Sequence, residues 1–487
     1  MIDEVVKIHD KFSVEIKLGF IARRKQEISD FTINTWIFVP QSLDINPATY
    51  SKTDFYRDLK SNIRLITPVY LLRDITGGEK SPVRILEKSF QNLASNPTRT
   101  RIADYEYHIK MFLSILKSTL REEIKHFGNN VIQDDKSFLV EQYISSVSKI
   151  ITEYRALRHV VNVPTVTREV LNYYFFGDEF MSNLIEQNTF KLLSLIKGSF
   201  AEKDQELIEK LLSLIQNEIA YKKEKGYPVV EKDCPDRNRR LLSRLGLLKK
   251  FAENELYLGA DKRKDGVLIE QVYLSIAAGI SMVFATAVAF SIQQKYGNFT
   301  MPFFVALVIS YMLKDRIKEL FRYYFAHKLG SRYFDQKTYI SLKGYKIGSG
   351  REAVDHIAID KVPDEVIKLR SRSSVFEDYA RQHADSVMLY RKMISINRRN
   401  LDKVSNYPTQ GINEIIRMNV SNFLLKMANA EVPLFVTDEN TVYAMVKGEK
   451  VYYLNLVMQL KNEKQMEYRH YRIVMNRKGI LDIEKIV

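Results

Sequence analysis

The segment 346–352, Lys-Ile-Gly-Ser-Gly-Arg-Glu, is the first place where residue types and spacing could serve chemistry. Closely spaced glycines let backbone amides approach a phosphate group, as they do in nucleotide-binding loops. However, the segment lacks the Gly-Lys-Ser or Gly-Lys-Thr ending that contacts the β- and γ-phosphates and the magnesium ion. A tight turn accounts for the glycines better, so we expect no nucleotide site here.

Histidine and cysteine residues show no catalytic spacing either. The eight histidines are scattered, without the two-histidine motifs of helical zinc sites. His383 and Asp385 would form an acid–base pair only if the fold brought a nucleophile beside them. The single cysteine, Cys234, allows neither an intramolecular disulfide nor a multi-cysteine zinc site. The sequence therefore predicts no metal and no cofactor, and it favours a non-enzymatic role, although dispersed residues could still assemble a catalytic site.

Aromatic and cationic residues alternate near the C-terminus, in the segment 468–472. Stacking of bases on aromatic rings, together with phosphate contacts to arginine, is a common way to bind single-stranded nucleic acid. The candidate contacts are Tyr468, Arg469, Tyr471 and Arg472. Exposed strand faces also collect such residues without a nucleic-acid ligand, so nucleic acid is an alternative partner and not the favoured one.

The overall charge narrows the class of partner. The chain has 487 residues, and its 74 Lys and Arg against 59 Asp and Glu give a net charge of +15. Such an excess favours anionic partners, which are either nucleic acid or the inner leaflet of a membrane. The 45% apolar and 27% charged content is ordinary for folded protein.

A charge-free stretch of 21 residues, 272–292, is the strongest feature of the sequence. As a helix it would span roughly 30 Å, the thickness of a hydrocarbon core. A second apolar stretch, 299–313, has 15 residues, or roughly 22 Å as a helix, which falls short of a full span. We therefore predict a two-helix transmembrane hairpin over 266–313, with a re-entrant or interfacial second segment as the alternative.

Basic residues flank this hairpin on both sides, which predicts the topology. Because Lys and Arg accumulate on the cytoplasmic side, both flanks should be cytoplasmic and only the short linker should face outward. The N-terminus also has no signal peptide pattern. We expect location in the plasma (inner) membrane with both termini cytoplasmic, and contact between the bilayer's anionic headgroups and Arg237, Arg239, Arg240, Lys262, Arg263, Lys264, Lys314, Arg316, Lys318 and Arg322.

Small residues recur every fourth position in the first apolar stretch, at Ala277, Ser281, Ala285 and Ala289. This spacing places them on one helix face, where another helix can approach closely. The partner is either the second segment of the same hairpin or the hairpin of another copy in a homo-oligomer. Chance in an alanine-rich stretch is the remaining explanation.

The residues after the hairpin, 314–337, are predicted to form a basic amphipathic juxtamembrane helix. Its apolar and aromatic residues share one face, and its cations lie elsewhere. Such a helix can lie among lipid headgroups or pack against a cytoplasmic domain.

The remaining chain predicts an α+β membrane protein. Residues 1–75 alternate as strands and predict a β-rich N-terminal module, in which 12–18 and 31–39 pair with each other. Residues 76–265 predict a long helical bundle, with a helix break at Gly177. In the C-terminal domain, 338–487, we expect helices at 364–401 and 412–428, followed by a five-stranded antiparallel meander over 432–486.

Three functions are compatible with these features. The first is an integral membrane anchor or adaptor whose cytoplasm-facing domains bind macromolecular partners. The second is an oligomerising effector that perturbs the bilayer through its hairpin. The third is a membrane-tethered nucleic-acid-binding protein. The hairpin and its basic flanks favour the first.

Overall fold

The computed structural model describes residues 2–22, 26–129, 133–196, 205–297, 300–324, 334–370, 385–438, 442–463 and 465–487. The chain forms two compact units. The β-rich unit comprises Met1–Ile63, Gly259–Val404 and Gly411–Val487, and the helical unit comprises Arg64–Leu258 and Ser405–Gln410. The prediction of a separate N-terminal module over 1–75 is therefore wrong, because the first 63 residues belong to the same unit as the C-terminal strands.

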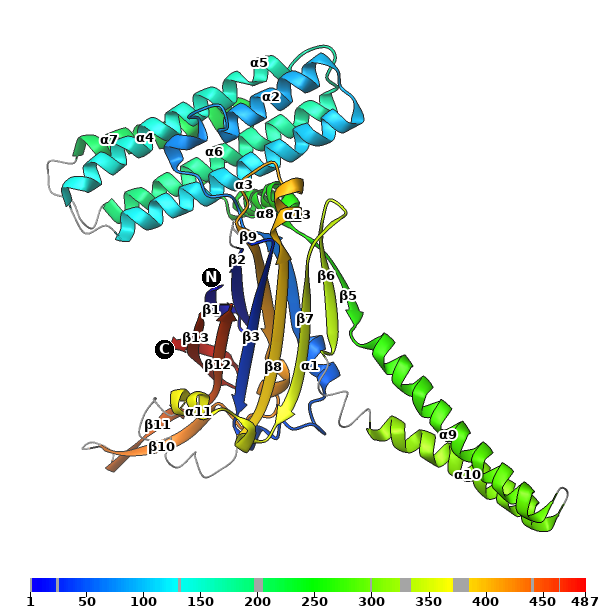
Figure 1. Cartoon of the computed structure of the whole chain (residues 1–487). Coiled ribbons are helices and arrows are strands. Elements are labelled where there is room, and N and C mark those ends of the chain that lie inside the picture. The colour runs from blue at the N-terminus through cyan, green and yellow to red at the C-terminus, as the bar shows by residue number, and fades with distance from the viewer. Residues whose placement is uncertain are drawn as a thin grey trace. The chain divides into compact units, whose positions relative to one another are not determined.

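The helical unit (Figure 1) is built from long amphipathic helices around one apolar core. These helices are α2 (Pro82–Ser95), α3 (Arg99–Asn129), α4 (Gln133–Ala156), α5 (Arg158–Val161), α6 (Arg168–Ile196), α7 (Gln205–Lys225) and α8 (Pro235–Glu253). Proline at the first turn of α2 and α8 costs no helical hydrogen bond, which helps to fix where each helix begins. The predicted bundle of long helices is confirmed.

The helix break predicted at Gly177 is wrong, since α6 runs through this residue without interruption. The glycine instead makes room for Tyr154, whose hydroxyl donates a hydrogen bond to the carbonyl of Tyr174 at 3.1 Å. A Cβ atom at position 177 would overlap that hydroxyl and also lie 3.2 Å from Ile109. Packing between helices, and not helix termination, therefore explains the glycine.

We expect Gly177→Ala to destabilise the helical unit. Overpacking costs typically about 1–3 kcal/mol, which meets or exceeds the gain of about 1 kcal/mol from better helix propensity. Thermal unfolding followed by far-UV circular dichroism measures the effect. Adding Tyr154→Phe should restore part of the loss, because it removes the overlapping hydroxyl. An alanine variant as stable as the parent would contradict this account.

The larger sheet of the β-rich unit has the strand order β14-β13-β12-β3-β8-β7-β6-β5. Its strands are β3 (Ile28–Val39), β5 (Gly259–Lys264), β6 (Gln336–Leu342), β7 (Tyr345–Ile357), β8 (Ser386–Asn397), β12 (Tyr452–Asn462), β13 (Met466–Asn476) and β14 (Gly479–Lys485). β3 is central and pairs antiparallel with both β12 and β8. Residues 35–39 of β3 are buried in succession, so both faces of the strand are covered at this end, which suits its run of apolar residues.

The smaller sheet has the order β1-β2-β9-β4, with β1 (Ile2–Asp10), β2 (Ser13–Ile21), β9 (Gly411–Asn419) and β4 (Leu59–Leu65). The predicted pairing of 12–18 with 31–39 is wrong, because β2 pairs with β1 and β9 while β3 lies in the larger sheet. Side chains of the two sheets meet, as in the ring contact of Phe20 with Phe31 at 5.4 Å between centroids. Short helices complete the unit: α1 (Lys52–Asp58), α11 (Asp364–Arg370), α13 (Arg398–Val404) and α14 (Ser421–Leu424).

The predicted C-terminal helices at 364–401 and 412–428 are wrong in part. In the first range, 364–370 and 398–401 are helical, 371–384 lie outside the described residues, and strand β8 takes up 386–397. In the second range, strand β9 takes up 412–419 and only 421–424 are helical. Each of these strands buries alternate residues. The buried set includes Lys392 in β8 and Glu414 in β9. A charge at a core position breaks the alternation of apolar and polar residues that identifies a half-buried strand, which is why the sequence pattern favoured helices.

The predicted five-stranded meander forms only in part. All five strands exist, but β10 (Glu431–Asp438) and β11 (Val442–Glu449) form a separate two-stranded ribbon. Successive residues point to opposite faces of the ribbon, and both faces are apolar and exposed. The exposed residues are Val432, Leu434, Phe435, Val436, Tyr443, Met445 and Val446.

Candidate functional site

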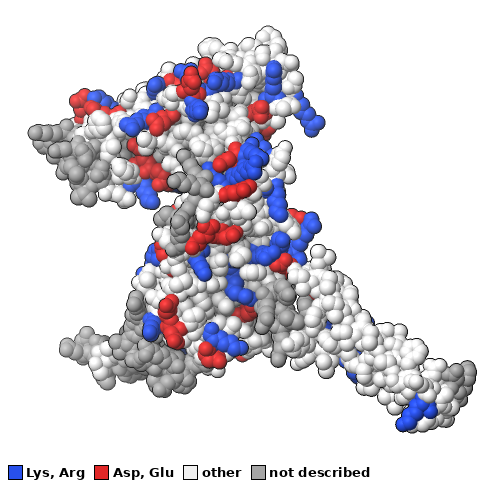
Figure 2. Space-filling model, viewed as in Figure 1, with Lys and Arg blue, Asp and Glu red and all other residues white. Residues whose placement is uncertain are grey.

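Helix α9 (Val267–Tyr296) contains the predicted first membrane segment. Its apolar side chains point into open space: Val283 is 68% exposed and Phe290 is 70% exposed. Among the helices of the described residues, α9 alone is long and apolar enough to cross a membrane. In Figure 2 the visible face of this segment carries few charges, unlike the mixed charges elsewhere on that face.

Helix α10 (Met301–Tyr324) follows α9 and packs against it as an antiparallel hairpin. Helix α10 is not apolar over a long enough stretch to qualify as a membrane-spanning helix, as α9 does. The prediction of two spanning helices is therefore supported only for the first of them. The apolar part of α10 ends at Leu313, about 20 Å from its start, and five charged residues follow within six positions. The basic helix predicted after Leu313 is present as far as Tyr324, where 314–324 continue α10 without a break. Residues 325–333 lie outside the described residues.

The ladder of small residues faces α10 of the same chain. Ala277 and Ser281 are the buried residues of α9, and the Ser310 hydroxyl donates a hydrogen bond to the carbonyl of Ala285 at 3.0 Å. Nearer the other end of the hairpin, the rings of Tyr273 and Phe321 lie 6.3 Å apart. These two contacts define the register between the helices.

Both ends of the hairpin are attached to one pair of neighbouring strands. β5 leads into α9, and β6 follows α10. The two strands pair antiparallel, with Lys264 opposite Gln336. The Asp265 amide donates to the carbonyl of Asp335 at 3.2 Å, which extends this pairing to the base of the hairpin. The chain therefore leaves and re-enters the larger sheet at the same point.

The predicted lipid-contacting cations divide between the two units. Arg237, Arg239 and Arg240 lie on α8 of the helical unit, whereas the others lie on β5 and α10. Several have acidic partners within the chain: Arg237 with Glu231 at 2.7 Å, Arg239 with Asp236 at 3.2 Å, Lys262 with Glu352 at 3.0 Å, Arg263 with Asp261 at 2.7 Å, Lys264 with Glu270 at 2.9 Å and Arg322 with Glu319 at 3.1 Å. The ammonium nitrogen of Lys314 lies 4.1 Å from the ring centroid of Tyr311.

The four predicted nucleic-acid contacts do not form one open face. They lie on β13, where Tyr468 and Arg472 point to one side and Arg469 and Tyr471 to the other. Arg469 pairs with Glu4 at 2.9 Å, and Tyr471 is buried with its hydroxyl donating to the same carboxylate. The polar groups of Arg469 and Tyr471 thus serve contacts within the fold, which leaves them less able to contact nucleic acid.

A buried cluster of charges between the two sheets was not anticipated from the sequence. Lys392 of β8 donates hydrogen bonds to Glu352 of β7, at 3.3 Å, and to Glu414 of β9. The hydroxyl of Tyr390 donates to Glu352 at 2.8 Å, and Lys262 of β5 pairs with the same carboxylate. All but Lys262 are buried. A lysine or glutamate inside a strand would be found from sequence only if its partner on another strand were already known.

Electrostatics holds the carboxylate of Glu352 in its charged form. Burial by itself would raise its pKa, but the ammonium groups of Lys392 and Lys262 and the hydrogen bond from Tyr390 lower it to about 2. Burial opposes the charge of Lys392 as well, but Glu414 and Glu352 outweigh it and raise the pKa of this ammonium. Glu352 and Lys392 are therefore both charged at neutral pH and form an ion pair.

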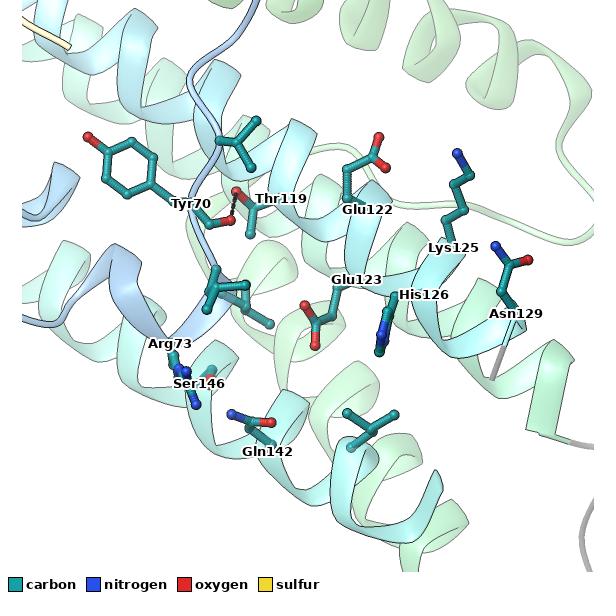
Figure 3. A pocket seen from close by; sticks show the side chains of 14 residues that line it. Tyr70, Arg73, Thr119, Glu122, Glu123, Lys125, His126, Asn129, Gln142 and Ser146 are labelled. Atoms are coloured by element: carbon teal, nitrogen blue, oxygen red, sulfur yellow. Dashed lines mark hydrogen bonds between the residues drawn. The ribbon is translucent and has the colours of Figure 1, made fainter. Parts of the chain in front are cut away.

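The helical unit contains an open pocket of about 540 Å³ between α3, α4 and the segment 69–73, which precedes α2. Glu123 and His126 project from α3 into the space facing Gln142 of α4, whereas Glu122 and Lys125 point away (Figure 3). Burial raises the pKa of Glu123. Val69, Leu71, Leu72 and Leu139 supply apolar lining. The pocket combines an apolar wall with a carboxyl group and an imidazole group, a mixture that is typical of binding pockets.

The comparisons with known proteins add no relative to these observations. The sequence matches no model of a known protein family, and its comparison with curated proteins gives no significant match.

Proposed function

We propose that this chain is an integral membrane anchor or adaptor, held in the bilayer by the α9–α10 hairpin, with both soluble units on the cytoplasmic side. The observation that carries the proposal is the exposure of the apolar side chains of α9. Large contiguous apolar patches are rare on the surface of soluble monomers, and they indicate contact with lipid or protein. A buried core helix would explain the composition, but only 11% of the most apolar part of α9 is buried.

The base of the hairpin supports a return to the same side. β5 and β6 pair directly, so the two ends of the segment 265–335 cannot be separated by a bilayer. A single crossing would separate them. Hence α9 crosses and α10 brings the chain back, or both helices enter only partway. The excess of Lys and Arg in both flanks supports the cytoplasmic side.

Two surfaces of the soluble units support the adaptor role. The β10–β11 ribbon exposes apolar residues on both faces, and two-stranded ribbons are marginally stable without a covering layer. Lipid is a poor cover, because the open strand edges would leave backbone amides and carbonyls without partners in hydrocarbon. Protein is the better cover. The pocket beside Glu123 and His126 offers a second place for a macromolecular partner to dock a side chain.

Alkaline carbonate extraction tests the anchor directly. Membranes from cells that express the full chain are extracted first with carbonate and then with detergent. We expect the chain to stay in the carbonate pellet and to dissolve in detergent. Release by carbonate would reject integral insertion. Cysteine residues placed at Gln294 and at Glu224, in a Cys234→Ser background, should react with an impermeant maleimide from opposite sides of sealed vesicles.

A further inference from the structure

We propose that several copies of the hairpin assemble in the membrane through a charged face of α10, with ion pairs formed between copies. The inference rests on the proposed membrane insertion and names the partner of the inserted segment. The face consists of Asp315, Lys318, Glu319 and Arg322, which are spaced three or four residues apart and so lie on one side of the helix.

The register of the hairpin determines how deep these charges lie. The contact of Ser310 with Ala285 and that of Tyr273 with Phe321 give the same antiparallel alignment. Extending it along the helices places Asp315 level with position 280 of α9 and Glu319 level with position 276. Since the charge-free stretch of α9 begins at Val272, Asp315 lies about 12 Å and Glu319 about 6 Å inside it, at 1.5 Å per residue.

A single hairpin would leave these groups poorly solvated. Long side chains such as Lys318 can reach toward the headgroups, but the short side chains of aspartate and glutamate cannot. α9 has no charged residue at these levels. Within α10, Arg322 pairs with Glu319 at 3.1 Å, and Asp315 is exposed. Charges inside a membrane are usually paired with one another across helices.

A second copy of the same face is the partner that fits. The face alternates in sign along the helix, so neighbouring copies at the same depth can place a carboxylate of one beside a cation of the other. Anionic headgroups would satisfy the cations and repel the acids. The ladder of small residues cannot serve this contact, because it already packs against α10 of its own chain. Of the two partners that the sequence left open for that ladder, the second segment of the same hairpin takes the place, and copies assemble through another face.

A charge-swap experiment tests the assembly. In the first variant, Asp315→Lys and Glu319→Lys make the face wholly positive; in the second, Lys318→Glu and Arg322→Glu make it wholly negative. The full chain is labelled at its single cysteine, Cys234, with donor or acceptor dye and reconstituted in phosphatidylcholine vesicles. Energy transfer between copies should be present for the parent and should fall at least about tenfold for each variant alone, because like charges then face each other. An equal mixture of the two variants should restore it.

A matched control separates this contact from general charge effects. Glu206→Lys and Glu209→Lys lie on the exposed surface of α7. They change the net charge of the chain by the same amount as the first variant and should leave energy transfer unchanged. No energy transfer for the parent at any protein-to-lipid ratio would overturn the proposal, as would variants that assemble like the parent or a mixture that fails to recover. Carbonate extraction of the same samples shows whether insertion itself has failed, which would refute the proposed anchor instead.

Discussion

Placing two arginines in the middle of α9, by Ile280→Arg and Val283→Arg, should release most of the protein from membranes. Both side chains are exposed and lie near the centre of the charge-free stretch. Each arginine at the centre of a membrane helix costs about 2.5–3.5 kcal/mol of insertion free energy. The two together therefore offset the favourable contribution of the apolar residues of α9. Carbonate extraction followed by immunoblotting measures the fraction that remains in the pellet.

The matched control carries the same chemical change outside the hairpin. Leu242→Arg and Leu247→Arg lie on α8 of the helical unit, where both leucines are exposed, and these changes should leave the pellet fraction unaltered. If the α9 variant stays as resistant to carbonate as the parent, then α9 is not the segment that holds the chain in the bilayer.

Replacing Lys392 by methionine should destabilise the β-rich unit by about 3–5 kcal/mol, the usual cost of removing one partner of a buried ion pair. Methionine fills a similar volume, so the main effect is electrostatic: Glu352 and Glu414 lose the ammonium group between them. The single tryptophan, Trp36, is buried in β3 of the same sheet. Its fluorescence during denaturant unfolding of the detergent-solubilised chain therefore reports this unit.

The double variant Lys392→Met/Glu414→Gln provides the control. In the single variant Glu352 keeps its ion pair with Lys262, whereas Glu414 loses the ammonium group of Lys392. Neutralising Glu414 removes this buried charge, so the double variant should be more stable than the single one. A single variant as stable as the parent would mean that the ion pairs contribute nothing to the packing of the two sheets.

The single variant Lys392→Met should also change how the free energy of unfolding depends on pH. In the parent, the pKa of Glu352 is lowered to about 2 from a reference value of 4.5. Its stabilisation is therefore present above pH 4.5 and is lost as the pH falls from 4.5 toward 2. Without Lys392, one of the groups that lower the pKa of Glu352 is gone, so this pKa rises from its lowered value and the acid loss shrinks. The difference in unfolding free energy between parent and variant should thus be largest near neutral pH and decrease below pH 4.5.

The long helices of the helical unit and the strands of residues 432–486 could be predicted because their patterns are local. An amphipathic helix or an alternating strand shows its buried face within a dozen residues. Helix α9 was also predicted from a local pattern, a charge-free stretch long enough to cross a bilayer, and its apolar side chains are exposed as that prediction requires. Gly177 shows the limit, because a glycine in such a helix cannot be assigned to a break or to a close packing contact without knowing that Tyr154 lies beside it.

The sequence by itself determined that this chain has a membrane-length apolar helix, basic flanks, a helical bundle and C-terminal strands. The tertiary structure alone decided the sheet partners, because β3 pairs with β12 and β8, more than 340 positions away in the chain. It also decided that Lys392 and Glu414 are core residues, since a charge is tolerated there only when its partner comes from another strand. The hairpin likewise combines a local pattern with a contact that only the tertiary structure shows. Hydrophobicity predicts that α9 can enter a membrane, but only its register with α10 shows that Asp315 and Glu319 would enter with it.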